Sequence, residues 1–387
     1  MDKNLINLFF FIQTLVTIYK AINLYDFVKI TVIGAGPAGL LASHLLKKAG
    51  HELSIIEEHK FIGKPISCSG LIGRDYFDHF DNFNFKASIL NRIDGAIVNF
   101  GNDSFELKRK GVSYVVDRSA FDQTLSKGLE VSLDERFQSF DRNKEKISIK
   151  TNKRKFNTDL LIGSDGPSSR VRAQEFDYKL RYYKGYQVRI KADLDLNNFV
   201  QVYLEKPFFT WIIPEGDGIY RMGTVSDNPK ETLRKFIFKK SIKGKIIEVQ
   251  AGVIPVGRGD VYKDRVFLLG DAACQVKPLS GGGVYYGSLA SEALAKSIIS
   301  GECNDYSKEC YRLIGKEISK GLFMRKIYEN LSEKELSKIF EFVKSKKQIL
   351  DEHGSFDEHY KTIFSLIKDP KALSFLPLFI KTYLRTF

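Results

Sequence analysis

The stretch of sequence that decides the fold is residues 27–39, which read FVKITVIGAGPAG. Residues 27–33 are mostly apolar and β-branched and predict a buried strand that ends at Gly34. Residues 40–48 predict a helix that stops at Gly50, and residues 54–56 predict a second short strand. A strand, a helix and a strand in this order form a βαβ unit, so the sequence predicts an α/β protein with a parallel sheet.

The loop between this strand and helix carries the pattern G-x-G-x-x-G. Gly34 permits a tight turn, Gly36 lets the backbone approach a pyrophosphate, and Gly39, after Ala38, lets the helix pack on the strand. Glu57 closes the second strand 18 residues after Gly39, where an acid accepts from ribose hydroxyls. A glycine-rich turn without a ligand is the alternative. Strand, helix and acid together favour dinucleotide binding.

Three later segments have the residues of a second wall for such a site. Arg118 precedes a predicted helix over 119–127, where its cation can meet a phosphate. Residues 160–170, LLIGSDGPSSR, predict a buried strand that ends in the turn at Asp165 and Gly166. Residues 267–284, FLLGDAACQVKPLSGGGV, predict another buried strand that leads through Asp271 to a glycine-rich helix start at Gly281, Gly282 and Gly283. Each segment alone is common, so their order and spacing carry the prediction.

Composition limits the class of protein less than these motifs do. The chain has 387 residues and a formal net charge of +13, which favours anionic partners without choosing among nucleic acid, acidic lipid, acidic protein or a phosphorylated substrate. A lysine-rich proteome is the alternative reading of that charge. Its four cysteines show neither CxxC pairing nor clustering, so we expect no metal site and a reducing, cytoplasmic location.

With these motifs the chain resembles a flavoprotein of the p-hydroxybenzoate hydroxylase superfamily, and within it the geranylgeranyl reductase family. The resemblance runs from about Phe27 to the C-terminus. It implies that the first glycine motif holds the diphosphate of FAD, that Arg118 lies by the FAD, and that Asp271 contacts the ribityl chain. It also implies that residues 278–283 face the isoalloxazine.

The resemblance to the reductases depends on two local matches. Residues 65–72, PISCSGLI, are similar to the cysteine-glycine-leucine loop of archaeal prenyl reductases. Residues 208–214, FFTWIIP, resemble their substrate motif Y-x-W-x-F-P and imply that Phe209, Trp211 and Pro214 contact substrate. The same stretch is one change from the W-x-W-x-I-P of flavin halogenases, and a tryptophan in such a strand is otherwise core.

The sequence pattern, together with this resemblance, predicts a division of the chain into four parts. They are an apolar extension at 1–25, a discontinuous Rossmann-like FAD-binding domain at 26–178 and 252–300, an antiparallel substrate domain at 179–251, and a helical region at 301–387. The implied function is FAD-dependent saturation of geranylgeranyl chains on archaeal phospholipid precursors. Cys68 is the expected proton relay or redox gate, and Tyr285 and Tyr286 are the expected proton donors.

The same motifs leave two alternative functions open, and they also predict the external reductant and the binding partners. One rival is an oxygen-using flavin monooxygenase or halogenase. The other is a membrane-associated electron-transfer flavoprotein acting on a quinone, although its relatives have an iron–sulfur cysteine cluster that this chain lacks. A second G-x-G-x-x-G is not visible, so we expect NAD(P)H that docks transiently, or ferredoxin, as external reductant. The expected partners are an isoprenoid lipid and a membrane surface, and not nucleic acid.

The two ends of the chain bear on the membrane. Residues 5–22 are apolar but short and interrupted, which indicates an interfacial helix rather than a span or a secretory signal. A misassigned start is an equal alternative, although Met222 is the next methionine. Residues 375–385 mix apolar and cationic side chains that fit a membrane contact or a closing helix. We therefore expect a cytoplasmic protein, peripheral on the inner face of the cell membrane.

Overall fold

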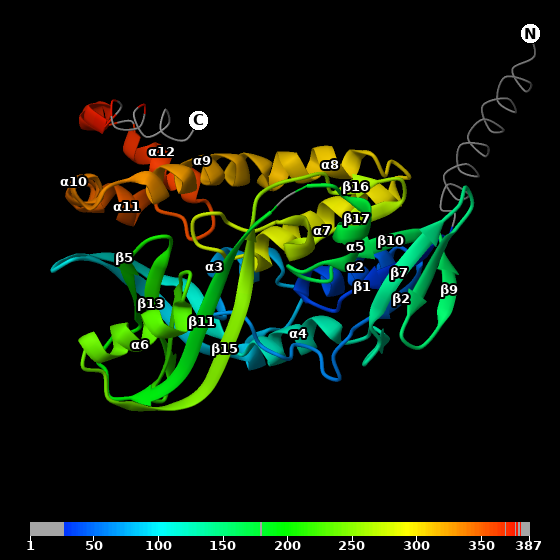
Figure 1. Cartoon of the computed structure of the whole chain (residues 1–387), viewed down its shortest axis with the longest axis horizontal. Helices are drawn as coiled ribbons and strands as arrows, with labels where there is room; N and C mark the ends of the chain where they lie inside the picture. Colours follow the sequence, from blue (N-terminus) through cyan, green and yellow to red (C-terminus); the bar gives the residue numbers. More distant parts are fainter. Residues whose placement is uncertain (1–26, 179, 368, 376, 378–379, 381–387) are drawn as a thin grey trace, which may run out of the picture.

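The computed structural model describes residues 27–387 except 179, 368, 376, 378–379 and 381–387. The expected N-terminal segment 5–22 and most of 375–385 lie outside the described residues. The molecule has two halves joined side by side, one built on a six-stranded sheet and the other on an eight-stranded sheet, with helices from the C-terminal part running along both (Figure 1).

The six-stranded sheet is the predicted nucleotide-binding sheet. Its strand order is β16-β17-β10-β1-β2-β6, and β1 pairs in parallel with both β2 and β10. The predicted βαβ unit is confirmed, with α2 beginning three residues earlier than expected because proline fits the first turn of a helix. The elements are β1 (Lys29–Ile33), α2 (Pro37–Lys48), β2 (Glu52–Ile56), β6 (Val131–Ser132), β10 (Leu160–Gly163), β16 (Tyr262–Lys263) and β17 (Val266–Leu268).

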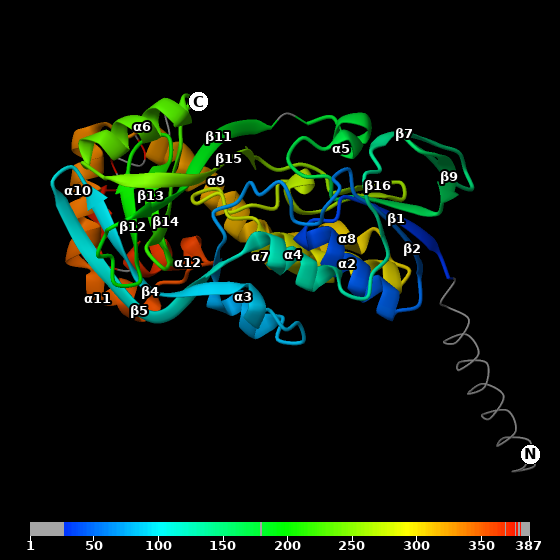
Figure 2. The ribbon, with the colours of Figure 1, turned by 90° about the horizontal axis from the view of Figure 1, so that it is seen from below.

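Alternating side chains of this sheet pack on two layers. Ile30 and Val32 belong to a core shared with the helices, while Ile33 faces a second core under a small three-stranded sheet. Figure 2 shows the helices on one side of the strands. The covering elements are α4 (Arg118–Ser126), α7 (Val284–Ile299) and α8 (Asp305–Cys310) on one face, and β7 (Phe137–Arg142), β8 (Ile147–Thr151), β9 (Lys155–Thr158) and α5 (Arg170–Glu175) on the other.

The eight-stranded sheet has the order β15-β11-β14-β13-β12-β4-β5-β3. The predicted antiparallel pairing is found at β11–β14, β13–β14 and β12–β13, whereas β12 and β4 run parallel, so the sheet is mixed. Its members are β3 (Leu71–Gly73), β4 (Ile89–Phe100), β5 (Asp103–Val116), β11 (Arg181–Ala192), β12 (Phe199–Leu204), β13 (Phe209–Gly216), β14 (Ile219–Val225) and β15 (Gly244–Val256). Strands β3 to β5 come from the range assigned to the FAD-binding domain, so the predicted bounds 179–251 are too narrow.

Helices complete both halves. Helix α6 (Pro229–Lys239) buries Leu233 and Phe236 on the outer face of the large sheet. The region after residue 301 is helical, as predicted. It contains a π-helical turn (Tyr311–Gly315), α9 (Lys316–Asn330), α10 (Glu333–Ser345), α11 (Lys347–His353), α12 (His359–Ile367) and a 3-10 turn (Pro370–Phe375). The remaining elements are α3 (Arg74–His79) and the 3-10 turns Lys86–Ser88 and Gly270–Ala273.

Candidate functional site

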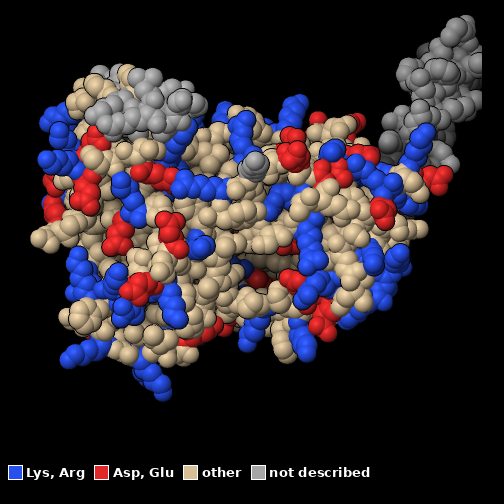
Figure 3. All heavy atoms as spheres, in the orientation of Figure 1, with Lys and Arg blue, Asp and Glu red and all other residues tan. Residues whose placement is uncertain are grey.

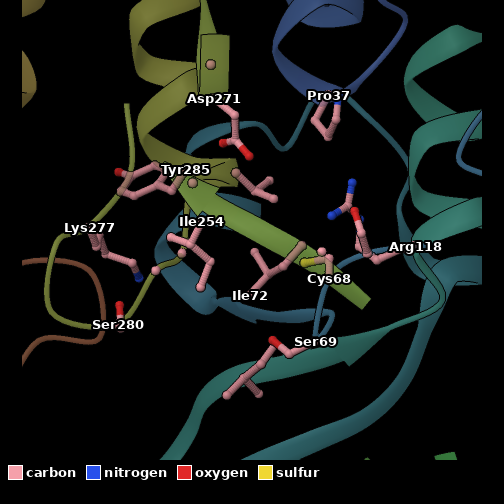
Figure 4. A pocket seen from close by; sticks show the side chains of 18 of the residues that line it. Pro37, Cys68, Ser69, Ile72, Arg118, Ile254, Asp271, Lys277, Ser280 and Tyr285 are labelled. Atoms are coloured by element: carbon pink, nitrogen blue, oxygen red, sulfur yellow. The ribbon is translucent and has the colours of Figure 1, made fainter. Parts of the chain in front are cut away.

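A cavity of about 1130 Å³ lies where the two sheets meet. The hollow visible near the middle of the surface in Figure 3 has acidic and basic side chains around it. Figure 4 shows that the wall of the cavity combines residues from the glycine loop (Pro37), the cysteine loop (Cys68 and Ser69) and the start of α7 (Tyr285). All the residues predicted to bind the cofactor line this one cavity: Gly34, Gly36, Ala38, Gly39, Glu57, Arg118, Asp165, Gly166, Asp271, Gly281, Gly282 and Gly283.

The glycines of the first loop have two different roles. Gly34 and Gly39 are required by the backbone packing, whereas Gly36 leaves open space beside the helix. Gly34 has φ +99°, and a Cβ there would clash with the carbonyl of Ser164. A Cβ on Gly39 would clash with the carbonyl of Gly34. A Cβ on Gly36 would meet no atom within 4 Å, although this residue caps α2 without a side-chain hydrogen bond. Open space beside an uncapped helix N-terminus is the arrangement that accepts a phosphate.

Three carboxylates, of Glu57, Asp165 and Asp271, follow the carboxyl ends of three parallel strands of the six-stranded sheet. Glu57 follows β2 and accepts the backbone N–H groups of Ala35 and His59, at 2.9 and 3.0 Å. Asp165 follows β10 and accepts the N–H groups of Arg170 and Val171, so it also stabilises the start of α5. The strand order therefore places their attached loops along one edge of the sheet, where α/β proteins bind ligands.

Asp271, which follows β17, is the carboxylate with unused acceptor capacity. Within the described part of the chain no hydrogen-bond donor reaches its side chain. Burial raises its pKa to about 6, against the opposing influence of Arg118 and Arg172. A carboxylate in this setting gains from a hydroxyl donor supplied by a ligand.

Arg118 and Cys68 form a neighbouring cluster on the cavity wall (Figure 4). The guanidinium of Arg118 pairs with Asp122 at 2.7 Å, yet its Nε is buried with no hydrogen-bond partner. Burial opposes its charged form, but Asp122 and the nearby Cys68 outweigh that effect and raise the pKa of Arg118. Arg118 therefore stays cationic. Cys68 itself is partly exposed to the cavity and accepts the N–H of Gly70 at 3.4 Å.

These observations fit a flavin dinucleotide. Space at Gly36 meets the needs of a pyrophosphate, and the free capacity of Asp271 suits a polyol hydroxyl. Ser280, in the glycine-rich turn before α7, has a buried hydroxyl without a partner and lines the same cavity. Unsatisfied polar groups that converge on one space are costly unless a ligand satisfies them.

The far part of the cavity is apolar. Of the three residues expected to contact substrate, Phe209 and Trp211 line it and Pro214 does not. Successive residues of a strand face opposite sides, so Ile213 shares the cavity face while Pro214 lies beside Tyr220 on the face covered by α6. The other apolar residues of this wall are Ile93, Ala96, Leu107, Val112, Val200, Val202, Val225 and Ile254.

The two tyrosines at the start of α7 point in different directions. Tyr285 lines the cavity, and burial raises its pKa to about 12, so its hydroxyl keeps its proton at neutral pH. Tyr286 is 4% exposed, does not line the cavity, and donates to the carbonyl of Asp357 at 3.0 Å. Consecutive helical residues are about 100° apart, which explains why only one reaches the cavity. The prediction that Tyr286 donates a proton there is therefore wrong.

Part of the wall comes from the helical region and was not predicted. Residues 354–357, between α11 and α12, line the cavity. Asp357 binds the ammonium group of Lys277 at 2.8 Å, and this pair is buried. Lys277 also donates to the carbonyl of Phe356 at 3.2 Å. The sequence carries no local sign of this pair, because the two residues are 80 positions apart.

A second contact that the sequence does not reveal fixes the cysteine loop. Arg221 on β14 donates through Nη1 to the carbonyl of Ser69 at 2.6 Å and through Nε to Glu215 at 2.7 Å. A Cβ on Gly70 would collide with this guanidinium, so the glycine permits the close approach. Glu215 is also bound by Arg189, and these arginines hold its pKa below the usual range despite burial.

Comparison with known proteins identifies the class first. Residues 32–80 match the family described as an NAD(P)-binding Rossmann-like domain. The fold is that of a geranylgeranyl bacteriochlorophyll reductase-like protein from Thermoplasma acidophilum, with a TM-score of 0.76, 21% identity, and 91% of this chain and 99% of the other covered. The flavin-dependent halogenase CmlS shares it less closely, with a TM-score of 0.60, 18% identity, and 78% and 64% covered. The chain thus has the fold of these proteins.

The particular resemblance follows from the relatives in sequence. An uncharacterized protein of Methanocaldococcus jannaschii is 29% identical over 383 residues, which cover 89% of this chain and 95% of the relative. Digeranylgeranylglycerophospholipid reductase of Methanosarcina acetivorans is 27% identical over 374 residues, covering 84% and 90%. The enzyme of the same name from Methanococcus aeolicus is 26% identical over 367 residues, covering 83% and 92%. The resemblance to geranylgeranyl reductases predicted from the sequence is confirmed.

Proposed function

We propose that this chain is an FAD-dependent reductase that saturates the isoprenoid double bonds of geranylgeranyl chains on archaeal-type membrane phospholipid precursors. The observation that carries the proposal is the continuity of one cavity, which joins a dinucleotide-binding edge to an apolar wall at Phe209, Trp211 and Ile213. An apolar wall of this kind accepts a hydrocarbon chain by burying it from water. The similarity to proteins named for this activity supports the substrate class.

The residues that would hold FAD follow from the geometry above. The N-terminus of α2 at Gly36 would receive the diphosphate, and Glu57 the adenosine ribose. Asp271 would accept from the ribityl chain, and the glycine-rich turn with Ser280 would border the flavin ring.

The chemistry requires a proton as well as a hydride. Reduced FAD, when bound, supplies the hydride. An isolated alkene is electron-rich, so a proton must reach one carbon as the hydride reaches the other. Tyr285 presents a hydroxyl that is protonated at neutral pH, and Cys68 presents a thiol from a loop held by Arg221. We assign Tyr285 and Cys68 to proton delivery, and the apolar wall to the exclusion of water.

An anaerobic turnover experiment tests the proposal. The purified flavoprotein is reduced with dithionite without oxygen, digeranylgeranylglyceryl phospholipid is added, and the lipid is analysed by mass spectrometry. We expect mass increments of about two daltons, one for each saturated bond. The main rival is a flavin monooxygenase or halogenase, because the motif F-x-W-x-I-P is one change from that of flavin halogenases. Unchanged lipid together with rapid oxygen-dependent turnover would support that rival and refute the reductase.

The electron donor and the cellular location are part of the same proposal. We propose NAD(P)H or ferredoxin as external reductant, with the flavin as the group that passes electrons to the lipid. None of the helices from residue 27 onward that the structure describes is long and apolar enough to cross a membrane. A lipid substrate nevertheless requires contact with a bilayer, so we place the protein at the cytoplasmic surface of the cell membrane.

A further inference from the structure

A group of large apolar side chains is exposed at one end of the molecule. Phe238, the next-to-last residue of α6, is 86% exposed. Ile246, Ile247 and Val249, near the start of β15, are 51%, 49% and 53% exposed. We call these four residues, with the surrounding Lys239, Lys240, Lys243 and Lys245, the α6–β15 patch. Isolated exposed apolar residues are ordinary, but these four lie on two elements that only the loop 240–243 separates, at one end of the molecule (Figure 1), and together they indicate a binding surface.

The fold does not use these side chains for its own core. Helix α6 packs through Leu233 and Phe236, and Phe238 lies about 200° around the helix from Phe236, away from the sheet. Strand β15 forms the edge of the large sheet. Its pairing with β11 shifts between Ile190↔Ile246 and Arg189↔Glu248, which leaves Ile247 as an extra residue in a bulge.

The charge around the patch indicates what it binds. Its four lysines are exposed, and the structure gives none of them an ion pair within its described residues. The one acidic residue within 239–249, Glu248, is paired with Arg189. Figure 3 shows basic side chains projecting at the lower left, where Figure 1 places α6 and the start of β15. Apolar side chains among lysines that form no ion pair match an anionic bilayer, because the acyl region accepts the apolar groups and the headgroups accept the cations.

Strand β15 also connects this surface with the cavity. Ile246, Ile247 and Val249 belong to the patch, and residues 250–254 of the same strand line the cavity. Ala251 is exposed and lines the cavity as well, so it lies at an opening. We infer that the α6–β15 patch docks the protein on an anionic lipid membrane and brings the cavity opening to its surface. The second half of this inference, lipid entry, rests on the proposed function.

Vesicle binding tests the docking without any turnover. The full chain with its flavin is sedimented with vesicles of mixed phosphatidylglycerol and phosphatidylcholine, or of phosphatidylcholine alone. We expect binding only to the anionic vesicles, with a loss of roughly tenfold or more in Phe238→Ser/Ile247→Ser and about fivefold per lysine in Lys243→Gln/Lys245→Gln. Binding should also weaken as salt is added.

Matched controls change similar side chains elsewhere. Tyr311→Ser removes another exposed aromatic residue, and Lys150→Gln/Lys155→Gln removes two exposed lysines at the opposite end, on β8 and β9. Both controls should bind like the unaltered protein. Vesicle binding by the patch variants equal to that of the unaltered protein would overturn the inference. The patch could instead pair two copies of the chain. In that case Phe238→Ser/Ile247→Ser would convert a dimer to a monomer and leave vesicle binding unchanged, which would also overturn the inference.

A comparison of detergent-dispersed lipid with lipid embedded in vesicles separates the role of the patch in lipid entry from the reductase activity. Patch variants should reduce detergent-dispersed lipid at the normal rate but lose activity on lipid embedded in anionic vesicles. If the unaltered protein reduces neither form while its vesicle binding depends on the patch, the docking surface stands and the proposed function fails. If patch variants reduce embedded lipid normally, lipid entry at this surface is refuted.

Discussion

Replacing Gly36 with alanine separates flavin binding from folding. The glycine has φ −78° and ψ 175°, a conformation open to alanine, and the new Cβ would meet no protein atom within 4 Å. Alanine is a poorer helix cap than glycine, at a cost of about 0.5–1 kcal/mol. The same change restricts the unfolded chain and returns about 0.4–1 kcal/mol. The free energy of unfolding of the flavin-free protein should therefore change by less than about 0.5 kcal/mol.

Flavin affinity should respond strongly to the same substitution. The added methyl group fills the open space at the N-terminus of α2 and holds a phosphate away from the first N–H groups of the helix. Loss of one hydrogen bond to a charged group costs about 1.5–3 kcal/mol. This corresponds to a dissociation constant that is roughly 10- to 100-fold larger.

Two measurements on the Gly36→Ala variant test the placement of the diphosphate. Urea denaturation of the flavin-free protein gives its stability, and quenching of FAD fluorescence gives the affinity. Gly34→Ala is the matched control, because its Cβ would clash with the carbonyl of Ser164 and its φ is positive, so that variant should lose stability. An affinity for FAD within a factor of two of the unaltered protein in Gly36→Ala would refute the placement of the diphosphate.

Three further predictions follow from the site. Arg221→Met should lower the free energy of unfolding by about 3 kcal/mol in urea denaturation, because it breaks a buried charge pair, and an unchanged value would contradict the clamp on the cysteine loop. Tyr285→Phe should slow prenyl reduction by about 100-fold with flavin affinity unchanged, whereas Tyr286→Phe should cost about 1 kcal/mol of stability and leave turnover intact; equal rates in both variants would refute the assignment. Burial and Lys277 lower the pKa of His359 from 6.5 to about 3, so as pH falls below 6.5 the unfolded chain takes up the proton first and stability declines. Between pH 7 and pH 5 the loss should be about 2 kcal/mol, and His359→Gln should remove it; the same pH slope in that variant would show that other groups cause it.

The edge at which the expected cofactor residues meet could be predicted because its signals are local. A glycine loop between a strand and a helix fixes its own geometry, and Glu57 and Asp271 reach the same edge because parallel strands end together. The error at Pro214 arose where a motif was applied as a block of residues, and the error at Tyr286 arose where two consecutive helical residues were expected to face the same cavity. Alternation along a strand and rotation along a helix place neighbouring side chains on different faces, whatever the motif.

The contacts that complete the cavity could not be predicted, since they join segments without sequence signals. A hydrogen-bonded chain starts at the indole of Trp211, which donates to Gln187 at 2.8 Å, and continues through Gln250 and Glu248 to Arg189. Arg189 binds Glu215, which also binds the Arg221 that holds the carbonyl of Ser69. The apolar wall and the cysteine loop are thus linked by buried and partly buried polar groups. A partly satisfied network of this kind is costly, so each member constrains the next. This linkage gives the apolar wall and the Cys68 loop one fixed relative position, which the proposed delivery of a proton and a hydride to adjacent carbons would require.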